Sequence, residues 1–258
     1  MDAILSFQNV TKRFPSAQGR GLFTAVEDAS FDMFPGEILG LLGESGCGKS
    51  TLARMLLKLI PVSEGRILYK NQDVTRMDER AFHPLRREIQ MVFQNPFNCL
   101  DPRVTIRRLL MEPLKVWNIG DSAADRIKRI EALCDECGLP LASLDKRPGE
   151  FSGGQLQRIA IIRALLTEPK LLVADEIVSA LDVSVQSQIL QLLLDMRRRH
   201  GLTILFITHD LTVIERMADR VMVMRHGHIR QVGPCDAILR SPTDDYVTEL
   251  KRAGFWML

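Results

Sequence analysis

The sequence predicts an α/β protein with a mostly parallel core sheet, an antiparallel β subdomain and a helical subdomain. Residues 43–51 match the phosphate-loop pattern G-x-x-x-x-G-K-[ST], which belongs between a buried strand and a helix. Further apolar runs of strand length alternate with helical segments, which is typical of a parallel sheet. Residues 95–165 interrupt this alternation with a mainly helical composition.

The segments that lead into and out of the phosphate loop fit this context. Residues 3–35 carry alternating apolar stretches that suit antiparallel strands. The short apolar run 37–42 has the length of a buried strand. Apolar residues recur at three- and four-residue spacing over 50–60, which predicts a helix that Pro61 ends. The phosphate motif therefore stands between a strand and a helix.

The chemistry of the loop explains its residue types. Gly46 and Gly48 permit positive φ and a close backbone approach, so that successive N–H groups form a nest for an anion. The following helix adds its positive end. Lys49 would contact the β- and γ-phosphates and Ser50 would bind Mg²⁺. The loop residues expected to bind the nucleoside triphosphate, which the family resemblance described below identifies as ATP, are Gly43, Glu44, Ser45, Gly46, Cys47, Gly48, Lys49, Ser50 and Thr51.

Further strands place polar residues at their carboxyl ends. A strand over 66–69 enters a turn, and the strand 89–93 ends at Gln94. The apolar run 171–174 ends in Asp175 and Glu176, and the run 203–207 is followed by Thr208 and His209. Open parallel sheets carry their chemistry at this edge.

These edge residues suit phosphoryl transfer. Asp175 would bind Mg²⁺, and Glu176 would orient or deprotonate the attacking water. His209 would sense the γ-phosphate, and Gln94 would contact Mg²⁺ or the water. The predicted catalytic residues are thus Glu176, His209 and Gln94, and the predicted Mg²⁺ ligands are Ser50, Gln94 and Asp175.

The helical segments have clear ends. Ser122 with Asp125 resembles a capping box, and Gly138 is a plausible stop. A long helix over 184–200 closes at Gly201, and its basic run 197–199 is interpreted as a solvated face. Cys134 and Cys137 lie one turn apart on a predicted helix, where core packing is favoured over a metal site.

Composition excludes several classes. The 258 residues carry a net charge of +2 with 26% charged residues, so no basic face for nucleic acid is expected. Five cysteines without a signal pattern indicate a reducing cytosolic setting. The N-terminus shows no basic segment followed by an apolar stretch, and no run has the length of a membrane span.

A second motif narrows the class of ATPase. The stretch 151–155 reads Phe-Ser-Gly-Gly-Gln, and 179–182 reads Ser-Ala-Leu-Asp. Together with the phosphate loop, Gln94, Asp175-Glu176 and His209, these motifs closely resemble the nucleotide-binding subunit of ABC transporters in order and spacing over nearly the whole chain. The resemblance implies a single ABC ATPase domain over 1–258. Its RecA-like core, with the antiparallel β part, would cover 1–94 and 166–258, and its helical signature subdomain 95–165.

The same resemblance implies an ATP- and Mg²⁺-dependent head-to-tail dimer. Ser152, Gly153, Gly154 and Gln155 would contact the γ-phosphate held by the partner's phosphate loop, and 179–182 would line the seam. Phe14 is the candidate for stacking on adenine, and Phe23 is a weaker one. Ile177 stands where proline is usual and Phe151 where leucine is usual; neither change removes a catalytic group.

A narrower resemblance concerns the transport system. The stretches 87–96, 100–103, 145–148 and 184–186 look like the ATP-binding subunits of the peptide/nickel importer family, and 246–250 resembles its tyrosine-containing C-terminal motif. This implies an ATP hydrolase that energises import of peptides or of free or chelated nickel. The end at Leu258 resembles the shorter nickel or metallophore importers slightly more.

The importer resemblance also implies partners. Two membrane permease subunits would dock beside residues 95–110. A second ATP-binding subunit, in a heterodimer or a homodimer, and an extracytoplasmic solute-binding protein would complete the complex. The chain would then lie at the cytoplasmic face of the inner membrane, bound through the permeases and without nucleic acid.

Three other classes share the nucleotide motifs. An exporter subunit is the nearest alternative, and the resemblance around 95–110 argues against it. A DNA-maintenance ATPase would need a long coiled-coil insert between the phosphate loop and the signature, where only residues 52–150 intervene. A soluble translation factor would carry two cassettes.

Overall fold

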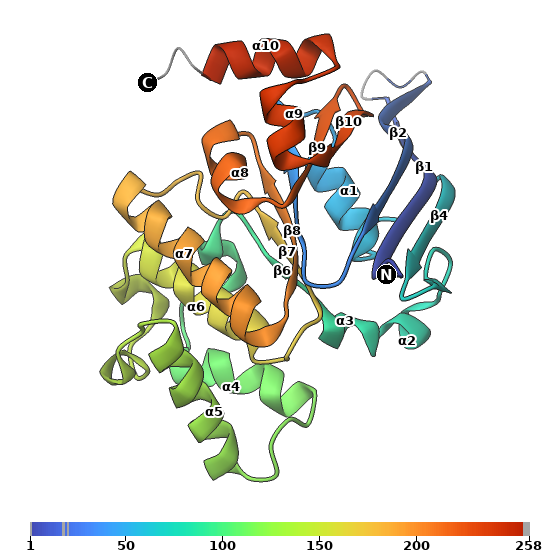
Figure 1. Ribbon diagram of the computed structural model, residues 1–258. Helices are drawn as coiled ribbons and strands as arrows, with labels where there is room; N and C mark the ends of the chain where they lie inside the picture. Colours follow the sequence, from blue (N-terminus) through green and yellow to red (C-terminus); the bar gives the residue numbers. More distant parts are fainter. Residues whose placement is uncertain (1, 17–18, 20, 255–258) are drawn as a thin grey trace. The chain divides into compact units, whose positions relative to one another are not determined.

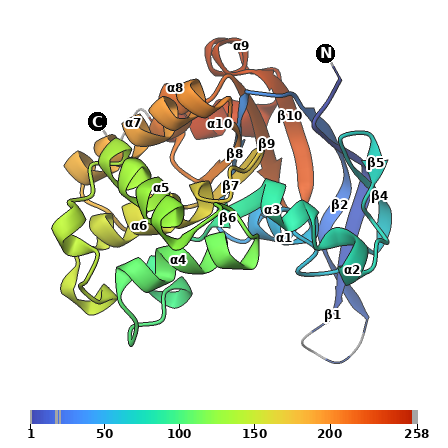
Figure 2. The same ribbon diagram turned by 90° about the horizontal axis from the view of Figure 1, so that it is seen from below.

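The structure, a computed structural model, describes residues 2–16, 19 and 21–254. The chain forms two compact units (Figures 1 and 2). The first combines Met1–His83 with Thr203–Leu258, and the second is Pro84–Leu202. The helical segment predicted over 95–165 lies inside the second unit, which also contains two parallel strands and the long helix that follows them.

An antiparallel sheet occupies one part of the first unit. Its strand order is β2-β1-β4-β5, and β1 pairs with both β2 and β4. Phe7 and Phe31 stack across β1 and β2 with ring centroids 4.7 Å apart. The prediction of antiparallel strands over 3–35 is confirmed. The strands are β1 (Leu5–Pro15), β2 (Leu22–Met33), β4 (Glu64–Tyr69) and β5 (Gln72–Asp73).

The other strands of the first unit form a mostly parallel arrangement. They are β3 (Ile38–Leu42), β8 (Thr203–Thr208), β9 (Arg220–Arg225) and β10 (His228–Pro234). β3 is parallel to β8 and to β9, and β10 is antiparallel to β9. Every residue of β3 and β8 is buried, as expected for strands covered on both faces. The strands predicted over 37–42 and 203–207 are confirmed.

The helix after the phosphate loop, α1 (Lys49–Leu56), is shorter than predicted. The expected end at Ile60 is wrong, because Lys58 adopts a left-handed conformation with φ 51°. The Lys58 and Leu59 N–H groups bond to the carbonyls of Met55 and Arg54, which is the Schellman pattern. A lysine occupies the position where glycine is usual, so the sequence lacks the glycine that would have predicted the end of α1.

The Lys58 side chain is held at this turn by further contacts. Its ammonium donates hydrogen bonds to the carbonyls of Val74 and Met77. The other helices of the first unit are α2 (Glu79–Phe82), α8 (Leu211–Met217), α9 (Cys235–Arg240) and α10 (Asp245–Gly254).

The second unit contains two parallel strands, β6 (Ile89–Val92) and β7 (Leu171–Asp175). Both were predicted and are confirmed. Its α-helices are α3 (Leu85–Glu88), α4 (Ile106–Val116), α5 (Ala123–Glu136), α6 (Gly153–Leu165) and α7 (Val183–His200). Short 3₁₀ turns cover Pro96–Cys99, Leu141–Ser143 and Pro148–Glu150.

The predicted helix ends in this unit are confirmed. The Ser122 hydroxyl accepts a hydrogen bond from the Asp125 N–H at the start of α5. Gly138, just after α5, has φ 65°, and Gly201 ends α7 with φ 61°. These positive φ values suit glycine at a helix C-terminus.

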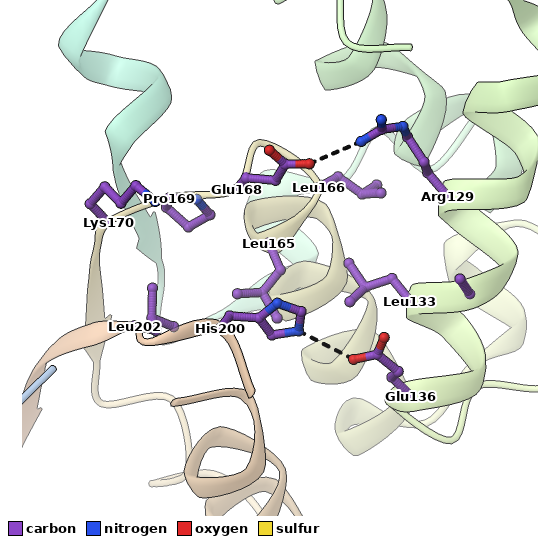
Figure 3. A pocket seen from close by; sticks show the side chains of 11 residues that line it. Arg129, Leu133, Glu136, Leu165, Leu166, Glu168, Pro169, Lys170, His200 and Leu202 are labelled. Carbon is purple, nitrogen blue, oxygen red and sulfur yellow. Dashed lines mark hydrogen bonds and ion pairs between the residues drawn. The ribbon is translucent and has the colours of Figure 1, made fainter. Parts of the chain in front are cut away.

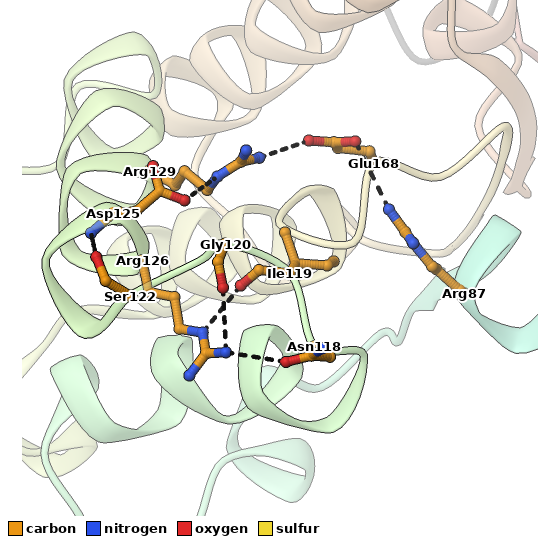
Figure 4. Close-up of polar contacts among 9 residues, drawn as sticks. All are labelled: Arg87, Asn118, Ile119, Gly120, Ser122, Asp125, Arg126, Arg129 and Glu168. Atoms are coloured by element: carbon orange, nitrogen blue, oxygen red, sulfur yellow. Dashed lines mark hydrogen bonds and ion pairs between the residues drawn. The ribbon is translucent and has the colours of Figure 1, made fainter.

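Polar contacts fasten α5 to its surroundings (Figure 4). Arg129 reaches Asp125 on its own helix at 3.2 Å and Glu168 at 2.9 Å. Glu168 also pairs with Arg87 at 3.8 Å. These groups are partly exposed, so their pairs contribute little stability. Through Glu168 they connect α5 to the turn before β7.

Cys134 and Cys137 lie in the core of the second unit, as predicted. Both are buried, and burial raises their thiol pKa values to about 11 and about 12. Among the described residues no group of three histidine, cysteine or acidic side chains could hold a metal ion. No helix within residues 2–16, 19 and 21–254 is long and apolar enough to span a membrane.

Candidate nucleotide site

The loop between β3 and α1 is packed too closely for side chains at two of its glycines. A Cβ on Gly43 would lie 2.3 Å from the Met224 carbonyl oxygen, and one on Gly48 would lie 2.5 Å from the Ala25 oxygen. Gly48 also has φ 112°. A Cβ on Gly46, which has φ 81°, would meet no heavy atom within 4 Å. The loop is therefore packed on one side and open at Gly46.

Lys49 lies inside the curve of this loop. Its side-chain ammonium donates hydrogen bonds to the carbonyls of Gly43 at 2.7 Å and Glu44 at 2.9 Å, and the residue is buried. Helix α1 begins without a hydrogen bond from a capping side chain. A cation beside an uncapped helix N-terminus provides the positive potential that an anion such as phosphate requires.

The Cys47 thiol lies next to the Lys49 ammonium, which donates to its sulfur at 3.9 Å. The residue is buried, and burial raises the pKa of its thiol, while the nearby Lys49 ammonium opposes that rise. The thiol therefore stays protonated at neutral pH and does not compete with phosphate as a negative charge.

His209 leaves the sheet next to the phosphate loop. Leu42 at the end of β3 pairs with Thr208 at the end of β8, so the residues that follow them start at adjacent points. Asp210 caps α8 through the N–H groups of Thr212 and Val213, which fixes the segment that carries His209. The imidazole residue itself is exposed.

The two adenine-stacking candidates face each other across strands β1 and β2. Phe14 pairs in register with Phe23. The Lys12 ammonium lies 4.8 Å from the centroid of the half-buried Phe14 ring, whereas Phe23 is 58% exposed. The strand pair thus holds both aromatic rings at one end of the antiparallel sheet.

In the second unit, Gln94 and Glu176 meet at the carboxyl edge of β6 and β7. Val92 pairs in register with Ala174, and each of the two polar residues follows two positions later. The Gln94 amide nitrogen donates a hydrogen bond to the Glu176 carboxylate at 3.1 Å. Asp175 is 9% exposed. This edge therefore combines a nearly buried carboxylate, a half-buried carboxylate and an amide.

The backbone at Glu176 is unusual. Its φ is 49°, a conformation that costs free energy in a residue with a side chain and often occurs at functional sites. Ser179 stabilises the turn, since its N–H and hydroxyl both donate to the Glu176 carbonyl. Ile177, at the position where the sequence lacks proline, is buried and contributes packing to the turn.

The signature stretch forms the start of α6. The Ser152 hydroxyl accepts a hydrogen bond from the Gln155 N–H, and the Gln155 side-chain oxygen accepts one from the Ser152 N–H. This is a complete capping box. Ser152 and Gln155 are exposed. The Ser152 hydroxyl retains its own proton for donation to another group.

The two signature glycines have different surroundings. A Cβ on Gly154 would lie 2.3 Å from a Val185 methyl group of α7, whereas one on Gly153 would meet only Leu181 at 3.6 Å. Gly154 therefore lets α6 and α7 pack closely. Gly153 has room for a side chain, so its packing within the chain gives no reason for glycine.

The predicted site residues fall into two groups, one in each unit. The first unit holds the phosphate loop, Phe14 and His209. The second unit brings Gln94 together with Glu176 at one sheet edge, and it places Ser152–Gln155 at the start of α6.

Sequence reasoning missed the residues that support the phosphate loop from β9 and from the turn between β9 and β10. Besides the Met224 carbonyl beside Gly43, the Gly227 N–H donates to the Cys47 carbonyl at 2.9 Å. The His226-Gly227 turn could have been recognised from its glycine, but its contact with a loop about 180 positions away could not.

A separate pocket of about 350 Å³ also escaped prediction (Figure 3). Leu133, Leu165 and Leu202 give it an apolar lining. His200 pairs with Glu136 at 3.2 Å, and Arg129 pairs with Glu168 at 2.9 Å. Four of the polar side chains that line it are thus paired with one another.

Comparison with known proteins decides the family. The sequence model of the ABC transporter family matches residues 26–179, which include the phosphate loop, the signature and the Asp175-Glu176 pair. The chain belongs to the ABC transporter family. The family resemblance that the motifs indicated is therefore confirmed.

Curated relatives of this ABC transporter chain include import ATPases. It is 45% identical over 261 residues to the glutathione import ATP-binding protein GsiA of Salmonella typhimurium and 43% identical over 259 residues to that of Escherichia coli K12. Each alignment covers 98% of the chain and 41% of the relative. The chain thus spans about two fifths of the length of these relatives.

Solved structures agree on the fold. The dimeric post-hydrolysis state of the ATP-binding cassette MJ0796 bound to ADP and Pi matches with a TM-score of 0.80 and 27% identity, over 90% of this chain and 98% of the other. The structure of cbiO1 from Clostridium perfringens, part of the ABC transporter complex cbiONQ, matches with 0.80 and 28%, over 100% and 99%. The predicted ABC ATPase fold is confirmed.

Proposed function

We propose that this chain is the ATP-binding and ATP-hydrolysing subunit of an ABC importer. The observation that carries the proposal is the edge of β6 and β7, where Glu176 follows the nearly buried Asp175 and accepts a hydrogen bond from Gln94. A carboxylate held by an amide beside a second carboxylate suits the orientation of water for phosphoryl transfer. The import ATP-binding proteins to which the chain is similar support the same activity.

The phosphate loop would bind the triphosphate through its backbone N–H groups and Lys49. In the structure the Lys49 ammonium occupies the curve of the loop and bonds to two loop carbonyls. A phosphate oxygen would compete for the same ammonium protons. Phe14 would stack on adenine, and the exposed Phe23 on the paired strand is the alternative.

The residues proposed to hold Mg²⁺ fit that ion chemically. Ser50, Gln94 and Asp175 offer a hydroxyl, an amide oxygen and a carboxylate, the oxygen donors that this hard cation prefers. Because the Gln94 nitrogen donates to Glu176, its amide oxygen remains the acceptor available to a cation. When bound, Mg²⁺ would neutralise charge that develops on the phosphate oxygens.

Glu176 would act on the attacking water. Its carboxylate accepts a hydrogen bond from Gln94, which restricts its direction, and the turn at Ser179 fixes its backbone. Glu176 would then orient the water or accept its proton. His209, on the segment held by the Asp210 cap, would donate a hydrogen bond to the γ-phosphate.

A second ATP-binding subunit would complete each site. The exposed start of α6 presents the Ser152 hydroxyl proton and the unhindered surface of Gly153. Ser152, Gly153, Gly154 and Gln155 would contact the γ-phosphate held by the partner's phosphate loop. The dimeric state described for a structurally similar cassette supports this arrangement, in a heterodimer or a homodimer.

A groove along α4 suits the permease subunits. It has a volume of about 580 Å³ and is lined by both charged and apolar side chains, among them Asp101, Val104, Arg108, Met111 and Lys115. Phe97, in the preceding 3₁₀ turn, is 53% exposed. Such a surface fits a short amphipathic helix. Two permeases would then hold the chain at the cytoplasmic face of the inner membrane, and an extracytoplasmic solute-binding protein would complete the transporter on the opposite side.

The cargo proposed first is a short peptide. The relatives that share 43–45% identity are named for glutathione import, and glutathione is a tripeptide. Free or chelated nickel is the second candidate, because of the resemblance to the peptide/nickel importer family.

Hydrolysis by the purified chain tests the catalytic assignment. Glu176→Gln keeps the size and hydrogen-bonding capacity of the side chain but removes its basicity. We expect ATP binding to persist and turnover to fall by about 10²–10⁴. Near-normal turnover in this variant would remove Glu176 from the catalytic role.

Uptake by cells tests the cargo. Cells with the wild-type chain or Glu176→Gln would be given labelled glutathione, a labelled dipeptide or radioactive nickel. We expect the variant to lose uptake of a peptide while nickel uptake persists. Loss of nickel uptake alone would identify a metal importer. If all three uptakes persist, the exporter alternative gains support.

A further inference from the structure

The phosphate loop is supported from behind by the turn between β9 and β10. The Met224 carbonyl occupies the space where Gly43 would carry a Cβ. The Gly227 N–H donates to the Cys47 carbonyl at 2.9 Å, and the Gly227 carbonyl accepts from the Glu27 N–H. A displacement of residues 224–227 would therefore move the phosphate loop at both Gly43 and Cys47, on either side of the Lys49 ammonium.

Arg225 lies within this supporting segment and contacts helix α10. Its guanidinium carbon is 4.3 Å from the centroid of the Tyr246 ring, and its side chain approaches Glu249 at 3.8 Å. Tyr246 is only 2% exposed. A cation over an aromatic face in such a desolvated place is attracted more strongly than at an exposed site.

Helix α10 is itself fastened to the first unit near Tyr246. Asp244, just before the helix, pairs with Arg230 of β10 at 2.8 Å and accepts a hydrogen bond from the Tyr246 N–H at 2.9 Å. The Lys251 ammonium donates to the Arg240 carbonyl at the end of α9 at 3.2 Å. In Figure 1 α10 accordingly lies beside α9, in the same unit as the phosphate loop.

The Tyr246 hydroxyl lies close enough to the phosphate loop for the charge of Glu44 to act on it. It is buried and makes no hydrogen bond in the described structure, and the same holds for the Arg225 Nε atom. Burial raises the pKa of Tyr246, and the charge of Glu44 in the phosphate loop raises it further. The hydroxyl therefore stays protonated and lies within electrostatic reach of the loop.

We propose that Tyr246 and Arg225 are positioning residues that hold the phosphate loop in its nucleotide-binding shape, so that the docking of α10 sets the affinity for nucleotide. Tyr246 of α10 contacts the Arg225 side chain. Arg225 lies in the same segment as Met224 and Gly227. These two residues contact the phosphate loop at Gly43 and Cys47. The inference rests on the proposed function of the loop in binding ATP. It adds that a helix remote in sequence controls how tightly the loop binds.

Titration of the purified full chain with a fluorescent ATP analogue tests this. Tyr246→Leu keeps a buried apolar side chain but removes the aromatic face, and Tyr246→Phe keeps the face and removes the hydroxyl. We expect the dissociation constant of Tyr246→Leu to rise roughly three- to thirtyfold, the range that a lost cation–π contact allows. Tyr246→Phe should bind like the wild type.

Val247→Ala provides the matched control. Val247 is also 2% exposed and lies on the same helix, so its truncation lowers stability without removing the Arg225 contact. We expect its thermal midpoint to fall and its nucleotide affinity to stay within about twofold of the wild type. Equal losses of affinity in Val247→Ala and Tyr246→Leu, or unchanged affinity in Tyr246→Leu, would overturn the proposal.

Two further variants keep the test decisive. If Tyr246→Leu does not fold, Arg225→Met tests the same contact from its partly exposed side and should weaken binding to a similar extent; wild-type affinity there would overturn the proposal. Lys49→Ala tests the underlying site. Unchanged ATP affinity in Lys49→Ala would contradict the proposed function. If Lys49→Ala loses ATP affinity while Tyr246→Leu keeps the wild-type value, only the role of α10 would be contradicted.

Discussion

Helices α1 and α6 both begin at glycine-containing segments, but only one of them has a capping side chain at its N-terminus. Helix α1 starts without a capping side chain, and the Lys49 ammonium fills the curve of its loop. Helix α6 starts with a complete capping box between Ser152 and Gln155. The first helix start leaves backbone donors for an external anion. The second uses the Ser152 and Gln155 N–H groups in its own capping box and presents an ordered hydroxyl.

The difference suits the two helix starts to two different ways of contacting phosphate. The start of α1 is packed on one side and has a lysine within it, so it is suited to bind a nucleotide by itself. The start of α6 is exposed and preformed, and it contains no cation among residues 152–155. It is suited to contact a phosphate that another loop already holds. Variants at each helix start should therefore change different measurements.

Among variants of the two helix starts, the largest expected effect follows from a negative charge at Gly153. A side chain fits there, since the nearest atom to its Cβ would be 3.6 Å away. A carboxylate in the first turn of a helix favours folding by about 0.3–1 kcal/mol, but Gly153→Asp would repel a phosphate. We expect wild-type stability and a loss of turnover of about 10²–10³, as for loss of a transition-state donor. Steady-state ATPase rates would measure turnover, and a thermal melt would measure stability. Normal turnover would contradict a contact between the start of α6 and phosphate.

Lys49→Ala should affect the other helix start. It removes a charge-assisted contact worth about 1.5–3 kcal/mol, so the dissociation constant for ATP should rise roughly 10- to 100-fold. Isothermal titration of the isolated chain would measure this. Gly153→Asp is the control, because its phosphate loop is intact and its affinity for ATP should be unchanged.

The two signature glycines should differ in stability. Gly154→Ala forces a Cβ against a Val185 methyl group at 2.3 Å, and the β-branched valine has few alternative rotamers. We expect a net loss of about 1–2 kcal/mol, since overpacking costs about 1–3 kcal/mol and alanine favours the helix. Gly153→Ala should unfold at the wild-type urea concentration or slightly above. An equal loss in both variants would show that Gly153 is also a packing position.

The smallest effect concerns the thiol of the phosphate loop. Because burial raises the pKa of Cys47, its reactive thiolate should form only at alkaline pH. We expect alkylation at pH 7 to be slower than for an exposed cysteine and to increase through pH 9, and ATP to slow it further. Mass spectrometry of the labelled residue would follow the rate. Fast alkylation at pH 7 would contradict the buried, protonated state.

Local patterns allowed much of the fold and the family to be predicted. The strand, loop and helix around Gly43–Thr51 follow from residues within about twenty positions, as do the caps at Ser122 and Gly201. The end of α1 was wrong because Lys58, a residue with a side chain, adopts positive φ. The glycine pattern that signals most helix ends is absent there.

Contacts between distant segments could not be predicted. Gly154 is fixed by Val185 of another helix, and Gly43 by the carbonyl of Met224. The hydrogen bond between Gln94 and Glu176 depends on the register of β6 and β7; the sequence indicated only that both residues end apolar strands. Such contacts depend on how segments pack, which single-sequence periodicity does not encode.

In the proposed function, α1 of one subunit and α6 of the other contact the same nucleotide. The most direct test mixes two variants. Lys49→Ala has an intact signature, and Gly153→Asp has an intact phosphate loop. ATP hydrolysis by the mixture is measured at the total protein concentration at which the wild type is active. At an ATP concentration near the wild-type dissociation constant, we predict that each variant alone hydrolyses ATP slowly. The mixture should recover a clear fraction of wild-type turnover, because one composite site is whole in each mixed dimer. An active wild type with a mixture no more active than its separate components would contradict the claim.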